Sequence, residues 1–206
     1  LGLCLIPLIK LNIKFRLFKE KEDKSRFTER FGIASIPRPK GEVIWIHATS
    51  VGEFKSADLI INKFYRDYII LVTTTTLSSA NFAKKYYGNK VIHQFAPFDI
   101  SIWVEKFIKN WRPKIVIWIE SDLWPITLKL IKQKKINAIL VNVRMSPKSF
   151  LRWKNIAFFY KEMTSCFSEI YAQSLLDKKR VNYLTNREIK FIGNLKLSSI
   201  VNFKEQ

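Results

Sequence analysis

Apolar runs of strand length alternate with segments of helical periodicity along most of the chain. The segments between the runs, such as residues 53–67 and 99–111, carry apolar residues at helical spacing. Continuous apolar runs are typical of parallel strands buried on both faces. The alternation therefore predicts an α/β domain with a doubly wound parallel sheet. Seven such runs lie at residues 42–47, 68–74, 90–96, 114–120, 136–142, 169–174 and 189–193.

Polar residues gather at the carboxyl ends of the predicted strands. Ligands of open α/β sheets bind beyond these ends, so we expect the functional site there. The first five strands are followed by "HATSVGE" (47–53), "TTTT" (73–76), "APFD" (96–99), "ESDLWP" (120–125) and "NVRMSPKS" (142–149).

Glu53 lies where the first strand gives way to a helix, and two roles fit that position. A carboxylate in the first turn of a helix stabilises the helix dipole, typically by about 0.3–1 kcal/mol. It can also act as a base aimed at a substrate. We expect Gly52 to let the backbone turn tightly before it, and Ser50 either caps the helix or binds a substrate. The residues alone leave these alternatives open.

Familiar cofactor motifs are not found in the sequence. None of the six glycines forms G-x-G-x-x-G or a P-loop, so we do not expect this chain alone to hold a nucleotide. No G-x-S-x-G nucleophile elbow is present. Cys4, Cys166, His47 and His93 show no metal-ligand spacing, so we expect no metal and no cofactor. Two isolated cysteines fit a reducing compartment.

The chain is strongly basic. It has 36 Lys and Arg against 17 Asp and Glu, a net charge of +19. The positive electrostatic potential of such a chain favours the binding of nucleic acid, anionic lipid headgroups or a phosphorylated substrate. The alternative is that the lysines only form a solvated surface. No nucleic-acid-binding signature is found, and carboxylates at the strand ends would repel phosphates. We therefore expect no nucleic-acid partner.

The first residues, "LGLCLIPLIKLNIKFRLF", combine apolar residues with Lys10, Lys14 and Arg16. The run is shorter than the roughly 20 apolar residues that span a bilayer. Apolar residues followed by basic ones indicate a membrane-associated helix with the domain on the cytoplasmic side. An amphipathic helix packed on the domain is the alternative. We expect residues 1–28 to be an anchor remnant and connector, and residues 29–196 to be the domain.

Seven blocks follow one another along most of the domain: "ERFG" (29–32), "WIHATSVGE" (45–53), "VTTTT" (72–76), "PFD" (97–99), "IESDLWP" (119–125), "NVRMSPKS" (142–149) and "GNLK" (193–196). In order and spacing they resemble the 3-deoxy-D-manno-octulosonic acid (Kdo) transferases of Gram-negative bacteria. The resemblance implies a GT-B glycosyltransferase whose amino-terminal Rossmann-like domain binds the acceptor. Residues 197–206 would then begin the crossing to a nucleotide-binding domain that this chain does not contain.

The resemblance also implies a reaction and its site. Kdo would pass from CMP-Kdo to lipid IVA, the lipid A precursor, with inversion and without a metal, at the cytoplasmic face of the inner membrane. Glu53 matches the family's catalytic base. Substrate-binding candidates are Ser50, Gly52, Thr74, Thr75, Glu120 and Arg144.

Several of these candidates also fit a structural role. Threonines suit strands for steric reasons, and Glu120 can be structural. Arg144 can clamp a phosphate or carboxylate through its planar guanidinium. The chain departs from the family at Asp122, where the family has Glu, and at Ile126, where it has Asn. A non-catalytic remnant that folds and binds acidic lipid is the competing hypothesis.

Overall fold

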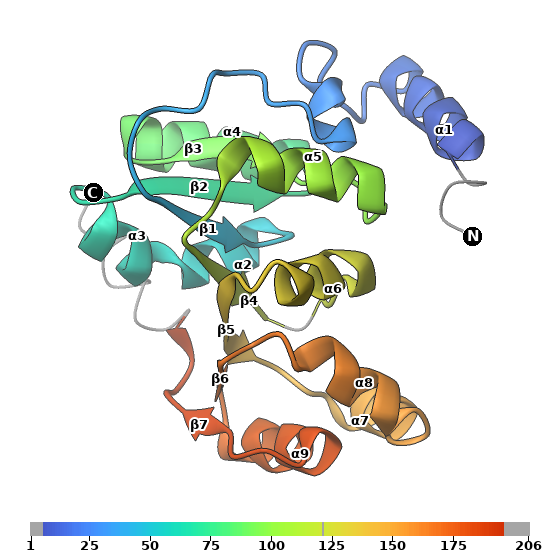
Figure 1. Cartoon of the computed structure of the whole chain (residues 1–206), viewed down its shortest axis with the longest axis vertical. Coiled ribbons are helices and arrows are strands. Elements are labelled where there is room, and N and C mark those ends of the chain that lie inside the picture. Colours follow the sequence, from blue (N-terminus) through green and yellow to red (C-terminus); the bar gives the residue numbers. More distant parts are fainter. Residues whose placement is uncertain (1–5, 121, 196–206) are drawn as a thin grey trace.

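A single seven-stranded parallel sheet forms the centre of the protein (Figure 1). The computed structural model describes residues 6–120 and 122–195. The strand order is β3-β2-β1-β4-β5-β6-β7, and every pairing is parallel. All seven predicted strands are confirmed. Their bounds are β1 Val43–His47, β2 Ile69–Thr74, β3 Ile92–Phe95, β4 Ile115–Ile119, β5 Asn137–Val143, β6 Glu169–Ala172 and β7 Lys190–Phe191.

Helices connect the strands, and both stretches expected to be helical from their periodicity, 53–67 and 99–111, contain helices. The predicted helix over 53–67 is divided in two at Ala57. The helices are α1 Ile6–Phe18, α2 Val51–Ser56, α3 Asp58–Phe64, α4 Leu77–Tyr87, α5 Ser101–Trp111, α6 Pro125–Gln133, α7 Pro147–Lys154, α8 Ala157–Thr164 and α9 Leu175–Thr185, with short 3-10 helices at Phe27–Phe31 (η2) and Gly88–Lys90 (η3).

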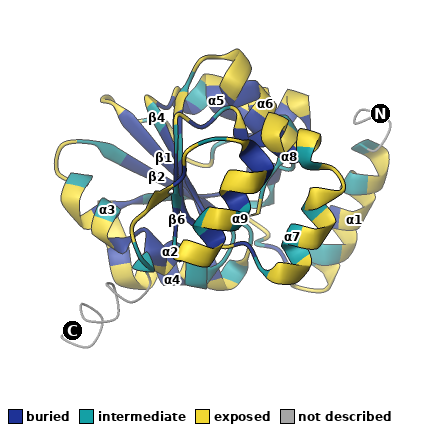
Figure 2. Cartoon of the chain, turned by 90° about the horizontal axis from the view of Figure 1, so that it is seen from below, coloured by how far each residue is buried: buried dark blue, intermediate teal, exposed yellow. Residues whose placement is uncertain are grey.

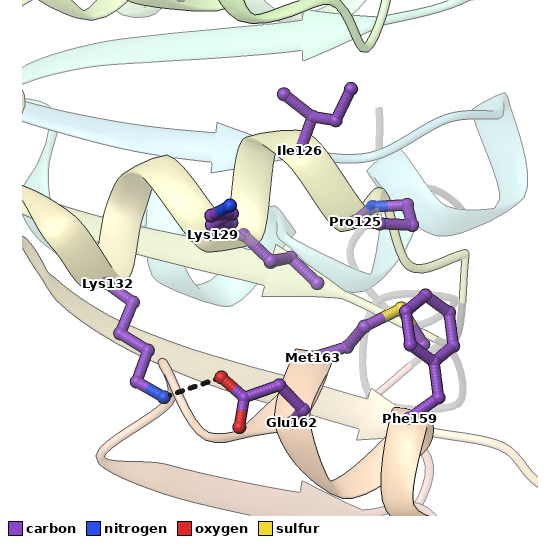
Figure 3. Close-up of a pocket in the computed structure, with 8 residues that line it drawn as sticks. Pro125, Ile126, Lys129, Lys132, Phe159, Glu162 and Met163 are labelled. Carbon is purple, nitrogen blue, oxygen red and sulfur yellow. Dashed lines mark hydrogen bonds and ion pairs between the residues drawn. The ribbon is translucent and has the colours of Figure 1, made fainter. Parts of the chain in front are cut away.

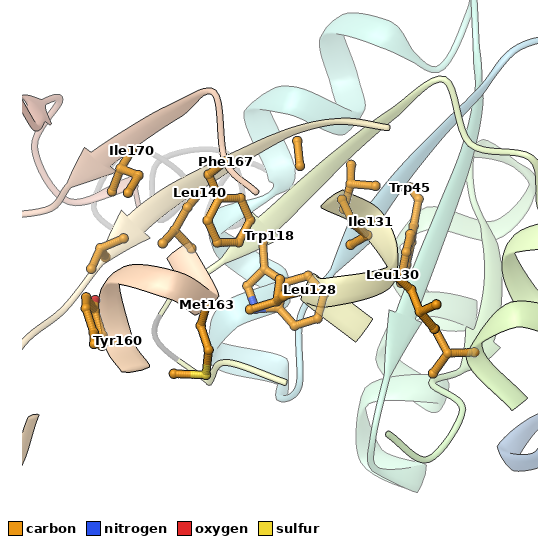
Figure 4. Packing of buried hydrophobic residues seen from close by; sticks show 14 of the residues in the cluster. Trp45, Trp118, Leu128, Leu130, Ile131, Leu140, Tyr160, Met163, Phe167 and Ile170 are labelled. Atoms are coloured by element: carbon orange, nitrogen blue, oxygen red, sulfur yellow. The ribbon is translucent and has the colours of Figure 1, made fainter. Parts of the chain in front are cut away.

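Successive strand residues point to opposite faces, and each face has its own hydrophobic core (Figure 2). Trp45 and Trp118 pack with residues of α5, α6, α8 and α9, which include Leu128 and Met163 (Figure 4). Ile44 and Ile46 pack on the other side with residues of α2, α3 and α4. Helices on both faces of a parallel sheet confirm the doubly wound Rossmann-like α/β fold.

The connector after α1 is fastened to the domain by buried ion pairs. The buried Glu22 accepts hydrogen bonds from Arg30 and Arg16. The Arg26 guanidinium donates two hydrogen bonds of 3.0 Å to the Glu29 carboxylate. Helix α1 itself stands apart from the sheet (Figure 1), with Ile13 as its buried residue. No helix in 6–120 or 122–195 combines the length and apolar character needed to cross a bilayer. The membrane role of α1 stays a prediction, and 197–206 lie outside the described residues.

Candidate functional site

Glu53 stands in the first turn of α2, at the carboxyl end of β1. Its carboxylate accepts hydrogen bonds from the backbone N–H of Thr49 at 2.6 Å and from the Thr49 hydroxyl at 2.8 and 2.9 Å. The Ser50 hydroxyl accepts a bond from the backbone N–H of Glu53 at 3.3 Å and caps the helix. This reciprocal arrangement resembles a capping box and holds the carboxylate in one orientation.

The prediction that the backbone turns tightly at Gly52 is wrong. Gly52 lies within α2, and it is not among the described residues with positive φ. The turn from strand to helix is made instead by Ser50, whose extended backbone (φ −130°, ψ 166°) is the usual conformation of a capping residue.

The pKa of the Glu53 carboxyl is raised above its ordinary value. Burial is the largest cause, and the nearby charges of Glu120 and Asp122 act in the same direction. The two hydrogen bonds from Thr49 oppose them. Since burial outweighs the hydrogen bonds, the structure gives a stronger base than an exposed helix-terminal glutamate would be.

Glu120 lies at the end of β4, next to β1 in the sheet, and has a left-handed backbone with φ 64°. Asn142 of the neighbouring β5 has φ 58°, and its amide lies 3.4 Å from the Glu120 carboxylate. The β5–β6 register shifts between Leu140 and Val143, so Asn142 sits in a bulge. Bulges re-aim side chains next to functional sites, and left-handed non-glycine residues gather at such sites.

Sequence reasoning missed the role of Asn142. This fully buried residue also donates to the Ser56 hydroxyl at 3.2 Å and accepts from the backbone N–H of Leu195 at 3.2 Å. It thereby joins α2, the end of β4 and the "GNLK" segment. An asparagine after an apolar run was the available signal, because Asn tolerates the left-handed conformation better than most residues.

The hydroxyls of the two threonine candidates bond to other parts of the protein and stabilise the structure beneath the site. The Thr74 hydroxyl is fully buried and lies 2.8 Å from His93 Nε2, so it faces the core and not the strand-end surface. Thr75 donates from its hydroxyl to the Thr49 carbonyl at 2.7 Å and steadies the loop that holds Glu53. Arg30 of "ERFG" donates to the Thr75 carbonyl at 2.6 Å.

Arg144 follows β5 and is exposed, as are Lys148 and Arg152 beyond it. The backbone of this segment is fixed from α9: Asp177 accepts from the Met145 N–H at 2.6 Å, and Arg180 donates to the Met145 carbonyl at 2.8 Å. The exposed guanidinium is therefore carried on a rigid support at the same edge as Glu53.

An aromatic cluster underlies the strand ends of β1 and β4, and sequence reasoning did not find it. The His47 ring lies 4.0 Å from the Trp118 ring and 4.6 Å from the Trp124 ring, centroid to centroid. Burial lowers the pKa of His47 to about 3, so the ring is neutral. Trp124 packs against His47 and Trp118. Within the described part of the chain, no three His, Cys, Asp or Glu residues form a group able to hold a metal ion.

Comparison with solved structures agrees with the fold. A UDP-N-acetylglucosamine 2-epimerase from Rickettsia bellii aligns with a TM-score of 0.56 over 81% of this chain and 48% of that chain. Its sequence identity is 10%, so the likeness shows the fold alone.

Comparison of sequences identifies the family. A 3-deoxy-D-manno-octulosonic acid transferase of Rickettsia bellii is 38% identical over 97% of this chain and 48% of its own length. A probable mitochondrial enzyme of that name from Arabidopsis thaliana is 41% identical over 72% of this chain and 34% of its length. The chain thus spans about half the length, or less, of these relatives. The family profile "3-Deoxy-D-manno-octulosonic-acid transferase (kdotransferase)" matches residues 25–199. The chain therefore belongs to the Kdo transferases, a family of glycosyltransferases.

Proposed function

We propose that the chain is the acceptor-binding half of a GT-B enzyme that transfers Kdo from CMP-Kdo to lipid IVA. The observation that carries this proposal is the Glu53 carboxylate, oriented by Thr49 and raised in pKa at the carboxyl edge of the sheet. Thr49 and Glu53 both lie within residues 25–199, which the family profile matches.

Glu53 is the general base of this reaction. A sugar hydroxyl is a weak nucleophile, and a positioned carboxylate makes it stronger by taking its proton in the transition state. The hydroxyl oxygen bonds to the anomeric carbon of Kdo as the bond from that carbon to the CMP phosphate breaks. The proton goes to Glu53, and the electron pair of the broken bond leaves with CMP. Attack from the face opposite the leaving group inverts the anomeric centre.

Acceptor binding draws on the groups around that base. The exposed Arg144 at the end of β5 pairs with a phosphate of the acceptor. Ser50 and Glu120 lie beside Glu53 and offer hydrogen bonds to sugar hydroxyls. Thr75 acts through the loop of Thr49, and the buried Thr74 belongs to the support beneath it.

The donor and the membrane complete the proposal. CMP-Kdo is held by a carboxyl-terminal half that corresponds to the part of the relatives this chain does not span. The protein works at the cytoplasmic face of the inner membrane, where α1 and the +19 charge favour contact with anionic lipid. The reaction as proposed needs no metal.

The test is transfer of Kdo from CMP-Kdo to lipid IVA. We would assay the 206-residue chain alone and together with a separately expressed carboxyl-terminal half of a relative. We expect activity only in the combined sample. A folded chain that binds the acceptor and never supports transfer would point to a non-catalytic remnant.

Glu53→Gln identifies the base within that assay. We expect the rate of transfer to fall by about 10²–10⁴-fold, with acceptor affinity retained because the amide keeps the shape of the side chain. Glu42→Gln is the matched control: Glu42 precedes β1 at the opposite edge of the sheet and pairs with Lys114. Unchanged transfer in Glu53→Gln would remove Glu53 from the mechanism.

A further inference from the structure

An apolar groove of about 320 Å³ runs between α6 and α8 (Figure 3). The buried side chains of Leu128 and Met163 line it. Pro125 and Phe159 flank one end, and an ion pair of 2.9 Å between Lys132 and Glu162 stands at the other. The groove is therefore short and apolar, and the ion pair between Lys132 and Glu162 lies at its far end.

The end of the groove beside Pro125 and Phe159 lies at the same edge of the sheet as Glu53. Helix α6 starts at Pro125, just after β4, the neighbour of β1. Its start is fixed by Asp99, which accepts from the backbone N–H groups of Ile126 and Thr127 at 3.0 and 2.7 Å. From Pro125 to Lys132 the helix extends about 10 Å, at 1.5 Å per residue. The groove thus leads away from the strand-end site along α6.

Apolar side chains continue from the groove onto the surface of the α7–α8 hairpin, residues 147–164. Ile156 is 52% exposed and Phe159 at the groove itself is 45% exposed, whereas Phe158, which is 82% exposed, does not line the groove. Large apolar groups left in contact with water mark a binding surface when they adjoin a groove.

Cationic side chains surround these apolar ones. Lys129 lines the groove, and Arg152, Lys154 and Lys161 are exposed on the hairpin. A ligand that matches this arrangement has an apolar tail and an anionic head, which is the chemistry of an acylated sugar phosphate.

We propose that the groove binds one acyl chain of the anionic lipid acceptor. The proposal rests on the function proposed above, because it gives that acceptor a second point of attachment. The chain enters beside Pro125 and Phe159 and lies over Leu128 and Met163. The sugar phosphate then remains at the strand ends, within reach of the Glu53 edge. The groove is thus a specificity element for acylated over deacylated acceptors.

Photo-crosslinking on the 206-residue chain tests the position directly. The probe is a water-soluble glucosamine phosphate that bears one medium-length acyl chain with a diazirine at its end. We expect peptide mapping to place the label within residues 125–133 and 157–164. A label mainly on α1, or spread over the surface, would overturn the assignment.

A pair of neighbouring substitutions tests the energetics. Phe159→Glu places a carboxylate at the groove, and we expect the affinity for the acylated probe to fall about tenfold. Phe158→Glu is the matched control, since Phe158 is on the same helix and does not line the groove. The deacylated sugar phosphate should bind equally well to both variants, and melting curves verify that both fold. Equal losses in the two variants, or none in Phe159→Glu, would contradict the groove.

The outcomes separate this inference from the proposed function. Transfer that depends on Glu53 while acylated and deacylated probes bind alike would refute the groove and leave the function standing. A label in the groove without any transfer in the combined sample would support a lipid site and refute the function. If neither probe binds the wild-type chain, both the groove and the acceptor-binding role are wrong.

Discussion

At the scale of single residues, the first turn of α2 combines two opposing demands on one carboxylate. The hydrogen bonds from Thr49 favour the charged form of Glu53, and its burial beside Glu120 disfavours that form. Burial is the larger effect. The burial that makes the Glu53 carboxylate useful as a base therefore also makes its ionised form destabilise the folded protein. Such a trade-off between activity and stability is common at functional sites.

Glu53→Gln should change how stability depends on pH. Because the native-state pKa lies above its ordinary value of 4.5, the native protein binds this proton more tightly than the unfolded chain. The free energy of unfolding is therefore lowered as pH rises from 4.5 through the native-state pKa, and stays lowered above it. Glutamine does not titrate, so the variant should gain stability relative to the wild type across that window.

Chemical denaturation of both proteins below pH 4.5 and at pH 7 measures this difference. Glu42→Gln again serves as the control, because Glu42 pairs with Lys114 at an exposed position. A stability difference that is constant with pH would show that hydrogen bonding balances burial at Glu53, and one that favours the wild type more strongly at pH 7 would show that hydrogen bonding outweighs it.

At the scale of the elements, the sequence predicted the strands better than the side chains they carry. Unbroken apolar runs identify parallel strands, so the sheet and the edge that bears Glu53 followed directly. The side-chain directions at the strand ends did not. Thr74 and Thr75 are adjacent and identical, yet one hydroxyl lies against the half-buried His93 and the other donates to the Thr49 carbonyl.

The residues whose roles sequence reasoning missed act through contacts between segments that are distant along the chain. Asn142 adopts a left-handed backbone within a bulge and bonds to Ser56 and Leu195. Glu29 and Arg30 were seen only as part of a motif, yet Glu29 accepts from the Phe95 N–H at 2.7 Å. Such partners lie more than fifty residues away along the chain, and no local pattern encodes them.

One glycine contact tests how closely these elements are packed. Gly32 ends the 3-10 helix η2 with φ 72°, and a Cβ there would stand 2.0 Å from the carbonyl oxygen of Trp103 in α5. Gly193 also has positive φ (79°), but nothing lies within 4 Å of its Cβ position. We expect Gly193→Ala to cost about 1–2 kcal/mol from the positive φ alone. Gly32→Ala should cost at least about 2 kcal/mol more.

Urea unfolding of the two alanine variants beside the wild type measures both costs. The comparison isolates the clash, because both glycines have a similar positive φ (72° and 79°) and differ in what a Cβ would meet. Equal costs would mean that α5 and η2 can separate without loss, and that the ERFG segment is only loosely attached to the sheet.

At the scale of the whole molecule, helix α1 and the α7–α8 hairpin, both with exposed apolar and basic residues, lie at one end. Figures 1 and 2 both place α1 and the α7–α8 hairpin on the side to which the carboxyl ends of the strands point. Leu8, Leu11, Phe15 and Phe18 of α1 are exposed, like Phe158 of the hairpin. An anionic bilayer at that end would contact both and would face the edge that carries Glu53.

Binding to anionic vesicles should therefore depend on where the positive charge is and not only on how much there is. Arg152→Glu with Lys154→Glu reverses two charges in the last turn of α7. Lys84→Glu with Lys85→Glu reverses two in the last turn of α4, which runs back towards the opposite edge of the sheet. Both double variants lower the net charge equally.

Because a basic residue near an anionic surface contributes about 1 kcal/mol, we expect vesicle affinity to fall at least tenfold more in the α7 variant than in the α4 variant. Sedimentation with phosphatidylglycerol-containing vesicles at low salt measures it, and raised salt should erase the difference. Equal losses would mean that the protein meets the membrane without a preferred orientation.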